Sequence, residues 1–272
     1  ALHLAALELK SGRSDMVVTG GVDTFNDIFM YMCFSKTPAL SPTGDARPFD
    51  AEGDGTVLGE GLGVVVLKRW EDAERDGDRI YAKILSIGTS SDGKGAAIYA
   101  PTAPGQQRAL RDAYQLAGVS PDTIGLVEAH GTGTSVGDAT ELKALDEVYR
   151  LAGARPGSVA LGSVKSQIGH TKAAAGAAGL LKAVMALHHK VQPPSLKIRR
   201  PLDALADSQS PFHVEEVARP WVRLPDQPRR AAVSSFGFGG SNFHAVLEEN
   251  QASRLEADWQ GICEIFAFSA DA

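Results

Sequence analysis

The sequence has 272 residues, 43% of them hydrophobic, which is enough to bury a large core in one large or two smaller domains. A formal net charge of −6 argues against a nucleic-acid surface, which would need a clustered excess of Lys and Arg. The sequence contains neither a secretory signal nor an apolar run long enough to cross a bilayer, so it predicts a cytoplasmic protein without a membrane span.

The first part of the chain is predicted to alternate between helices and strands. Apolar residues at positions 2–9 favour a helix that ends near Ser11 and Gly12. The continuous apolar run at 15–22 is typical of a strand buried in a parallel sheet. The elements predicted after it are a strand at 59–68, a charged surface connector at 70–79 and a strand at 81–88.

The two cysteines, Cys33 and Cys263, are too few for a disulfide framework and have no His or Cys neighbours at metal-ligand spacing. The sequence therefore predicts no metal site, and both thiols are expected to be reduced and buried. Cys33 is rejected as a nucleophile, because Met32 and Phe34 give it an apolar setting, whereas a catalytic thiol needs a helix N-terminus or a basic group beside it. The aromatic and Met-rich segment at 25–34 is interpreted as core or subunit interface.

Two histidines follow predicted strands in the second part of the chain. Short apolar runs at 124–127 and 159–164 lead into His130 and His170, which both have Gly and Thr neighbours. Ligands bind at the carboxyl ends of strands in an open α/β sheet, so two strands that deliver histidines there favour one shared site. Lys165, five positions before His170, belongs to the same segment. The sequence therefore predicts that both imidazoles face a common cleft.

Helices and a terminal hairpin are predicted around these strands. The segment at 90–103 is expected to form a loop over the cleft. The other predicted elements are an amphipathic helix at 104–117, a helix that begins at Glu141, a helix at 171–189, an extended connector at 191–198, an irregular segment at 202–222 and two hairpin strands at 230–236 and 243–248.

Four long motifs carry a resemblance to a known family. They are ARPFDAEGDGTVLGEGLGVVVLKR at 46–69, HGTGT at 130–134, SVKSQIGHTKAAAGAAGLLK at 163–182 and SSFGFGGSNFHAVLEE at 234–249. In this order and spacing they resemble the β-ketoacyl synthase (ketosynthase) family. The segment at 18–42 is similar to the ketosynthase domains of iterative type I polyketide synthases and polyunsaturated-fatty-acid synthases.

The resemblance implies a fold and a division of the chain. The fold is α/β, with a thiolase-like layered α-β-α-β-α architecture that has an incomplete N-terminal half and a complete C-terminal half. We expect residues 1–78 to be the remainder of the N-terminal half, 79–250 to be the C-terminal half, and 251–272 to begin a linker to a downstream domain. The family's nucleophilic cysteine lies a few residues upstream of position 1, so the resemblance implies an N-terminal truncation that removes the nucleophile.

The resemblance also implies roles for individual residues. His130 and His170 match the catalytic histidine pair, and Lys165 matches the lysine that fixes this pair. Glu141 matches a glutamate that organises these three groups. The positions that match substrate-binding residues are Thr132 and Thr134, which would hold a phosphopantetheine arm, and Phe238 and Gly239, in the turn that would gate acyl access.

The implied activity is that of a β-ketoacyl-carrier-protein synthase, an acyltransferase that condenses malonyl-carrier protein with an acyl thioester and releases carbon dioxide. Its partners would be an acyl carrier protein, malonyl and acyl thioesters, and a second copy in a homodimer. The domain itself would bind no cofactor, because the phosphopantetheine of the carrier protein carries the substrates. Without the cysteine, this chain is expected not to condense alone.

Two other functions remain open at this stage. A non-catalytic partner protein of the chain-length-factor kind would be expected to lose the histidines, which this sequence retains. A non-decarboxylative thiolase would use a second cysteine as a base, where the motifs here supply His170. A metal hydrolase is disfavoured, because no third ligand accompanies either histidine.

Overall fold

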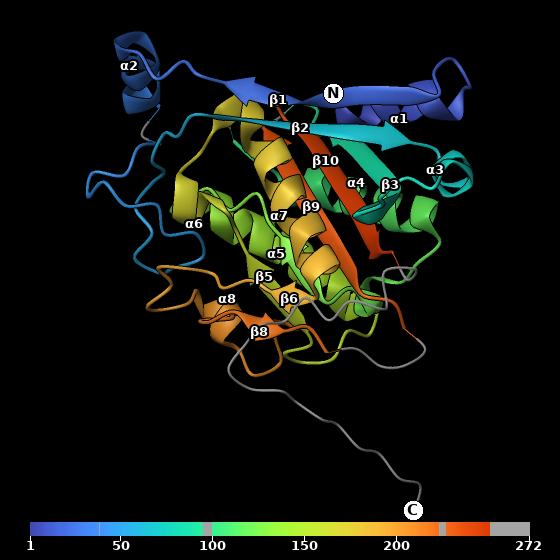
Figure 1. Ribbon diagram of the computed structural model, residues 1–272. Helices are drawn as coiled ribbons and strands as arrows, with labels where there is room; N and C mark the ends of the chain where they lie inside the picture. The colour runs from blue at the N-terminus through green and yellow to red at the C-terminus, as the bar shows by residue number, and fades with distance from the viewer. Residues whose placement is uncertain (38, 95–99, 223–226, 251–272) are drawn as a thin grey trace, which may run out of the picture.

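A six-stranded mixed sheet lies at the centre of the computed structural model, which describes residues 1–37, 39–94, 100–222 and 227–250 (Figure 1). In order across the sheet, the strands are β3 (Ala82–Ser91), β10 (Ser241–Glu249), β9 (Arg230–Gly237), β4 (Leu126–Glu128), β5 (Val159–Gly162) and β7 (Phe212–His213). The last four run parallel, while β10 is antiparallel to both of its neighbours. The α/β class and the terminal β9–β10 hairpin predicted from the sequence are both confirmed.

Helices cover both faces of this sheet. Helices α4 (Ala103–Ala117) and α5 (Ser135–Leu151) pack on one face, and α7 (Ala175–His189) packs on the other. Successive side chains of β4 point to opposite faces of the sheet. Val127 packs in the hydrophobic cluster beneath α4 and α5, and Leu126 packs in the cluster beneath α7. This double coverage explains why the strand is apolar on both faces.

A second, thinner layer lies beyond α7 (Figure 1). Strands β1 (Met16–Asp23) and β2 (Gly61–Lys68) pair antiparallel in a two-stranded sheet, which contacts α7 and α1 (Leu2–Lys10). The described residues thus form helix, sheet, helix and sheet layers in succession. The prediction that β1 is a buried strand of a parallel sheet was wrong, because β1 is antiparallel and its alternate residues are exposed.

The outer face of the β1–β2 layer is apolar. More than half of the surface of each of its large side chains is exposed: Met16, Val18, Val22, Leu62, Val64 and Val66. The sequence pattern of an apolar strand is the same whether or not another element covers it, which is why the prediction failed.

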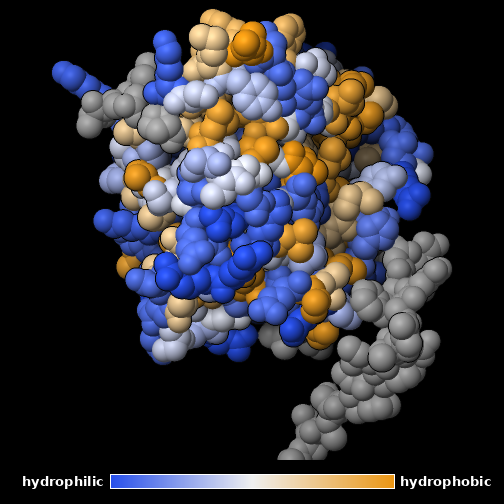
Figure 2. Space-filling view, turned by 90° about the vertical axis from the view of Figure 1, so that its left-hand side faces the viewer, coloured by the Kyte–Doolittle hydropathy of each residue, from blue (hydrophilic) through white to orange (hydrophobic). Residues whose placement is uncertain are grey.

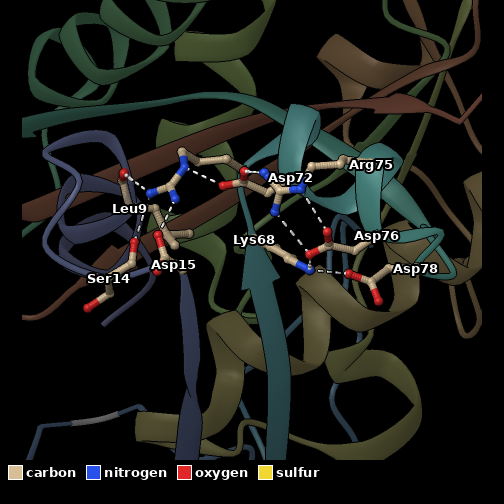
Figure 3. Close-up of polar contacts among 9 residues, drawn as sticks. Leu9, Ser14, Asp15, Lys68, Asp72, Arg75, Asp76 and Asp78 are labelled. Atoms are coloured by element: carbon tan, nitrogen blue, oxygen red, sulfur yellow. Dashed lines mark hydrogen bonds and ion pairs between the residues drawn. The ribbon is translucent and has the colours of Figure 1, made fainter.

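Helix α3 (Trp70–Asp76) occupies the segment predicted to be a charged connector, so the prediction of a surface location holds but the element is a helix. The guanidinium of Arg69 donates to the carbonyls of Leu9, at 3.0 Å, and Ser14, at 2.8 Å, and pairs with Asp15 (Figure 3). These contacts fasten the end of α1 and the start of β1 to the end of β2.

Helix α2 (Ile28–Lys36) stands at the edge of the molecule, and none of its residues is buried. Its hydrophobic residues form the upper edge of the face in Figure 2. The segment is therefore not part of the core of this chain. Cys33 is exposed, so the prediction of a buried thiol was wrong for this residue, while Cys263 lies outside the described residues.

The remaining elements are short: η1 (Pro121–Thr123), α6 (Lys165–Ile168), η2 (Lys172–Ala174), β6 (Val191–Gln192), α8 (Asp203–Ala206) and β8 (Arg219–Pro220). No helix among the described residues is long and apolar enough to span a membrane. The predicted linker at 251–272 and part of the predicted loop, 95–99, fall outside the described residues. The predicted boundary at 78–79 falls between α3 and β3 and stays a prediction.

Candidate active site

The carboxyl ends of β4 and β5 bring His130 and His170 together. The two strands are parallel neighbours, with Glu128 opposite Gly162, so the loops that follow leave the sheet at the same edge. The ring centroids of the histidines lie 5.4 Å apart, and the rings meet edge to face at 83°. Both residues are half-buried, which leaves them accessible to a ligand. Phe236 of β9 packs against the His130 ring at 6.0 Å between centroids.

Carboxylates from α5 hold the backbone of the His130 loop. Glu141 accepts hydrogen bonds from the backbone N–H groups of His130 and Gly131, both at 2.8 Å. Asp138 accepts from the N–H of Thr132 at 2.9 Å and from that of Phe49 at 2.8 Å. All of these contacts fix main chain, so they set where the histidine ring lies without touching it.

Helix α5 begins at Ser135, six residues before the predicted start at Glu141. A helix that began at Glu141 would place this carboxylate in its first turn, where it would complement the helix dipole. In the structure Glu141 lies in the second turn, and it is 2% exposed, with its side chain directed at the loop. The position of Glu141 is explained by the loop that it binds, and the local sequence signals that mark a helix start do not contain this information.

The side chain of Lys165 contacts the backbone of His130. Its ammonium donates a hydrogen bond to the carbonyl of His130, and its side chain is buried. Burial lowers the pKa of Lys165, and the carboxylates of Glu128 and Glu141 oppose that effect. The lysine therefore acts on the site through the His130 backbone and through its charge.

His170 has a defined orientation. Its Nδ1 accepts a hydrogen bond from the backbone N–H of Lys172 at 3.0 Å. Lys172 adopts a positive φ of 47°, an unfavourable conformation for a residue with a side chain. Its side chain is held by Asp23, at 3.1 Å, and by the carbonyl of Gly59, also at 3.1 Å. Because a neutral imidazole carries one proton, this acceptor role for Nδ1 places the N–H at Nε2.

The environment keeps both imidazoles neutral. Burial, reinforced by the nearby charge of Lys165, lowers the pKa of His130 well below its ordinary value and lowers that of His170 to about 3. Burial also raises the pKa of Asp138 to about 6 and that of Glu141 to about 7, against the backbone N–H donors that favour their charged forms. Near neutral pH both imidazoles are therefore uncharged.

The residues predicted to bind substrate are only partly gathered here. Thr132 and Thr134 follow His130, and their hydroxyls are 2.8 Å apart in a mutual hydrogen bond. Phe238 is 65% exposed in the β9–β10 turn, and its ring centroid lies 6.0 Å from that of Phe34 in α2. Gly239 has a φ of 89°, a conformation that glycine adopts readily.

Three further residues, which the sequence patterns do not single out, contact the segments of the site. Asp138 holds the HGTGT backbone, and Glu128 and Lys182 form an ion pair of 2.7 Å beneath both loops. Asp138 falls in the same GD-x-x-E segment as Glu141, which could have drawn attention to it. Nothing in the sequence pairs Glu128 with Lys182, which lie 54 positions apart and meet only in the fold.

A mainly apolar cavity of about 280 Å³ lies between α1, α7 and the two sheets. Its wall includes Lys172 and Ala173, which follow His170 closely, and Ser235 and Phe243 from the terminal hairpin. The described residues contain no cluster of three or more His, Cys, Asp or Glu that could hold a metal ion.

Comparison with known proteins gives consistent results. The family model "Beta-ketoacyl synthase, N-terminal domain" matches residues 1–73, and "Beta-ketoacyl synthase, C-terminal domain" matches residues 81–199. The chain is 48% identical over 262 residues to a polyunsaturated fatty acid synthase polypeptide of Thraustochytrium sp., covering 94% of this chain and 9% of that protein. It is 45% identical over 262 residues to a mycocerosic acid synthase-like polyketide synthase of Mycolicibacterium smegmatis, covering 96% of this chain and 12% of that protein.

A solved structure shows the same fold. The ketosynthase from module 6 of the bacillaene synthase of Bacillus subtilis 168 superposes with a TM-score of 0.89 at 43% identity. The match covers 92% of this chain and 45% of that chain. This likeness confirms the thiolase-like layered fold predicted from the sequence. The chain spans less than half of the length of the solved protein and a small part of the length of the curated relatives that it matches.

Proposed function

This chain belongs to the β-ketoacyl synthase family, and from that premise we propose that its histidine pair decarboxylates a malonyl thioester as one half of a condensing reaction. The observation that carries the proposal is the convergence of two neutral imidazoles, with ring centroids 5.4 Å apart, at the carboxyl ends of two neighbouring strands.

The chemistry requires a site for one negatively charged oxygen. When the bond between the malonyl carboxylate and its α-carbon breaks, carbon dioxide leaves and the electron pair forms an enolate whose charge collects on the thioester oxygen. A preorganised N–H donor at such an oxygen contributes about 3 kcal/mol to transition-state stability. His170 suits this role, because its Nδ1 is occupied by the Lys172 N–H and its Nε2 carries the proton.

The depressed histidine pKa values support the same role. A neutral imidazole donates its N–H to a developing oxyanion, whereas a charged one would also attract the malonyl carboxylate and stabilise the substrate before carbon dioxide leaves. The buried Lys165 ammonium adds positive charge below His130 without competing for the substrate, because it donates to the His130 carbonyl. In this scheme Lys165 and Glu141 are positioning residues.

The complete condensation would also need a thiol to hold the acyl group. Cys33 is the one cysteine among the described residues, and it lies exposed on α2. We therefore propose that the acyl-holding thiol, and with it the acyltransferase step, belongs to the part of a longer ketosynthase polypeptide with which this chain does not align.

The partners follow from the substrate. We propose that malonyl and acyl groups reach the site on the phosphopantetheine arm of an acyl carrier protein, near the hydroxyls of Thr132 and Thr134, and that the domain binds no cofactor of its own. We propose a homodimer as the assembled state, because the large exposed apolar side chains of α2 are typical of an interface.

The test is release of carbon dioxide from malonyl-carrier protein by the wild-type chain and by His170→Ala and His130→Ala. Each substitution removes one donor, so each is expected to lower the rate by about 100-fold to 1,000-fold. A non-catalytic protein of the chain-length-factor kind would give no release above background even in the wild type, and formation of a condensed product by this chain alone would contradict the assignment of the thiol.

A further inference from the structure

A buried ion pair that the proposed chemistry does not use lies at the strand end from which the His130 loop leaves the sheet. Glu128 is the last residue of β4, and Lys182 lies on α7; the carboxylate and the ammonium are 2.7 Å apart. Their side chains are 1% and 11% exposed, so water contributes little to screening the pair.

The pair touches each of the segments that carry a site residue. Glu128 precedes the His130 loop by two positions, and its second oxygen accepts a hydrogen bond of 2.6 Å from the backbone N–H of Val164. Val164 directly precedes Lys165. Lys182 belongs to α7, which follows His170 through the short helix η2. One carboxylate therefore joins the strand before His130, the segment of Lys165 and the helix after His170.

The surrounding glycines leave the space that the pair occupies. A Cβ at Gly179 of α7 would lie 3.2 Å from Cγ of Glu128, tighter than most such contacts. A Cβ at Gly162, the last residue of β5, would lie 2.3 Å from Oγ of Ser195 and 3.5 Å, an ordinary contact distance, from the ammonium of Lys182. Helix and sheet thus approach closely around the two charges, which favours one fixed geometry over a flexible surface contact.

Charge adds a second link to the site. Among neighbouring charges, Glu128 most strongly opposes the lowering of the Lys165 pKa by burial, followed by Glu141 and Asp138, whereas Lys182 lowers this pKa further. Removal of the Glu128 charge would leave two buried ammonium groups near the His130 loop with less compensation.

We propose that Glu128 and Lys182 form a positioning pair that sets the two histidine loops at one fixed separation and stabilises the charge beneath them. The expected effect of this pair on the reaction rate rests on the proposed function. Its expected effect on the position of the histidine rings rests on geometry alone. Neither residue touches the substrate in this scheme.

Glu128→Gln tests the proposal in the full chain. The amide keeps an acceptor for the Val164 N–H but removes the charge, and it leaves the Lys182 ammonium buried without a counter-charge. The matched control is Glu249→Gln, since Glu249 also accepts a backbone N–H, from Arg229 at 2.9 Å, and pairs with its guanidinium at 2.8 Å. Glu249 is also buried but lies beside the amino end of β9.

The first readout is the set of ring signals of His130 and His170 in proton–carbon NMR spectra, assigned with the single histidine variants. Glu128→Gln is expected to shift both sets of signals, and Glu249→Gln is expected to leave them in place. The second readout is the malonyl decarboxylation rate per folded molecule, which is expected to fall about 100-fold in Glu128→Gln, as for a misplacement of about 1 Å, and less than about twofold in the control.

A double variant keeps the test decisive if the single change prevents folding. Glu128→Gln with Lys182→Met removes the unpaired ammonium and is expected to fold and to regain part of the rate. The proposal is overturned if Glu128→Gln, or the double variant, loses stability as the control does but leaves both histidine signals unmoved. If the wild type releases no carbon dioxide while Glu128→Gln still shifts both signals, the proposed function fails and the positioning role stands.

Discussion

The two sheets of this molecule contrast in what covers them. The six-stranded sheet has helices on both faces, and side chains such as Leu145 and Val127 are fully buried. The β1–β2 sheet is covered only on the side of α1 and α7 within the described residues, and Leu62 is 71% exposed on its other side. Both sheets use similar apolar residues, so composition does not decide burial. The chemistry lies in the covered region, where carboxylates and lysines can be held in fixed pairs.

The largest difference between the regions is expected from truncation of one leucine in each. Leu145→Ala in α5 removes a side chain that is 0% exposed and is expected to lower the free energy of unfolding by about 3 kcal/mol. Leu62→Ala, at 71% exposure, is expected to change it by no more than about 0.5 kcal/mol. Urea unfolding followed by circular dichroism measures both. Similar losses would show that the outer face of β2 is covered in solution.

Carboxylates that accept backbone N–H groups provide a second contrast. Glu141→Ala leaves the buried N–H groups of His130 and Gly131 without their acceptor and is expected to cost about 2 kcal/mol. Glu60 accepts the N–H of Asn26 at 2.8 Å in an exposed setting, so water replaces it in Glu60→Ala and the cost is expected to stay near zero. Thermal unfolding of the two variants compares them, and an equal loss would contradict the role of burial.

The pH dependence of stability is expected to come from the covered region. His244 is 0% exposed, and burial lowers its pKa from 6.5 to about 3. Between these values the unfolded chain binds a proton that the folded chain does not, so stability falls as the pH falls from 6.5 towards 3. One such group contributes about 1.4 kcal/mol per pH unit in that window.

His244→Asn isolates this contribution. The free energy of unfolding of this variant is measured in urea at about pH 7, 6, 5 and 4. It is expected to fall less steeply with acidification than that of the wild type, by about 1.4 kcal/mol per pH unit. Parallel curves for the two proteins would mean that His244 takes up its proton in the folded chain as readily as in the unfolded chain.

The smallest effect is expected on the uncovered face. Val64→Lys introduces a charge at a position that is 55% exposed and is expected to change stability by no more than about 0.5 kcal/mol while reducing the binding of a hydrophobic dye. A loss of more than about 2 kcal/mol in Val64→Lys would show that another surface packs on this face.

Local sequence signals predicted the elements that depend on local chemistry. Thr102 accepts the N–H of Gly105 at the start of α4, and Gly118 adopts a φ of 65° at its end, as expected for a helix bounded by these residue types. The apolar runs before His130 and His170 became neighbouring parallel strands that are buried along their length, as is typical of strands covered on both faces.

The predictions that failed concern features that are set by tertiary contacts between segments far apart in the sequence. The exposure of β1 and of Cys33 is decided by which elements cover them, and the start of α5 is decided by the loop that Asp138 and Glu141 bind. The pairing of Glu128 with Lys182 is likewise a tertiary contact. Motifs identified the histidines, but only the fold shows which buried charges hold them.

In the proposed reaction the imidazoles of His130 and His170 bind one oxygen atom together. The most direct test of this shared binding is a nitrogen-15 NMR titration of the histidine rings with a stable malonyl thioester analogue that cannot lose carbon dioxide. The ring-nitrogen signals of both histidines are expected to shift together, with a single dissociation constant and without protonation of either ring. A shift of one ring alone, or of neither ring at saturating ligand, would contradict it.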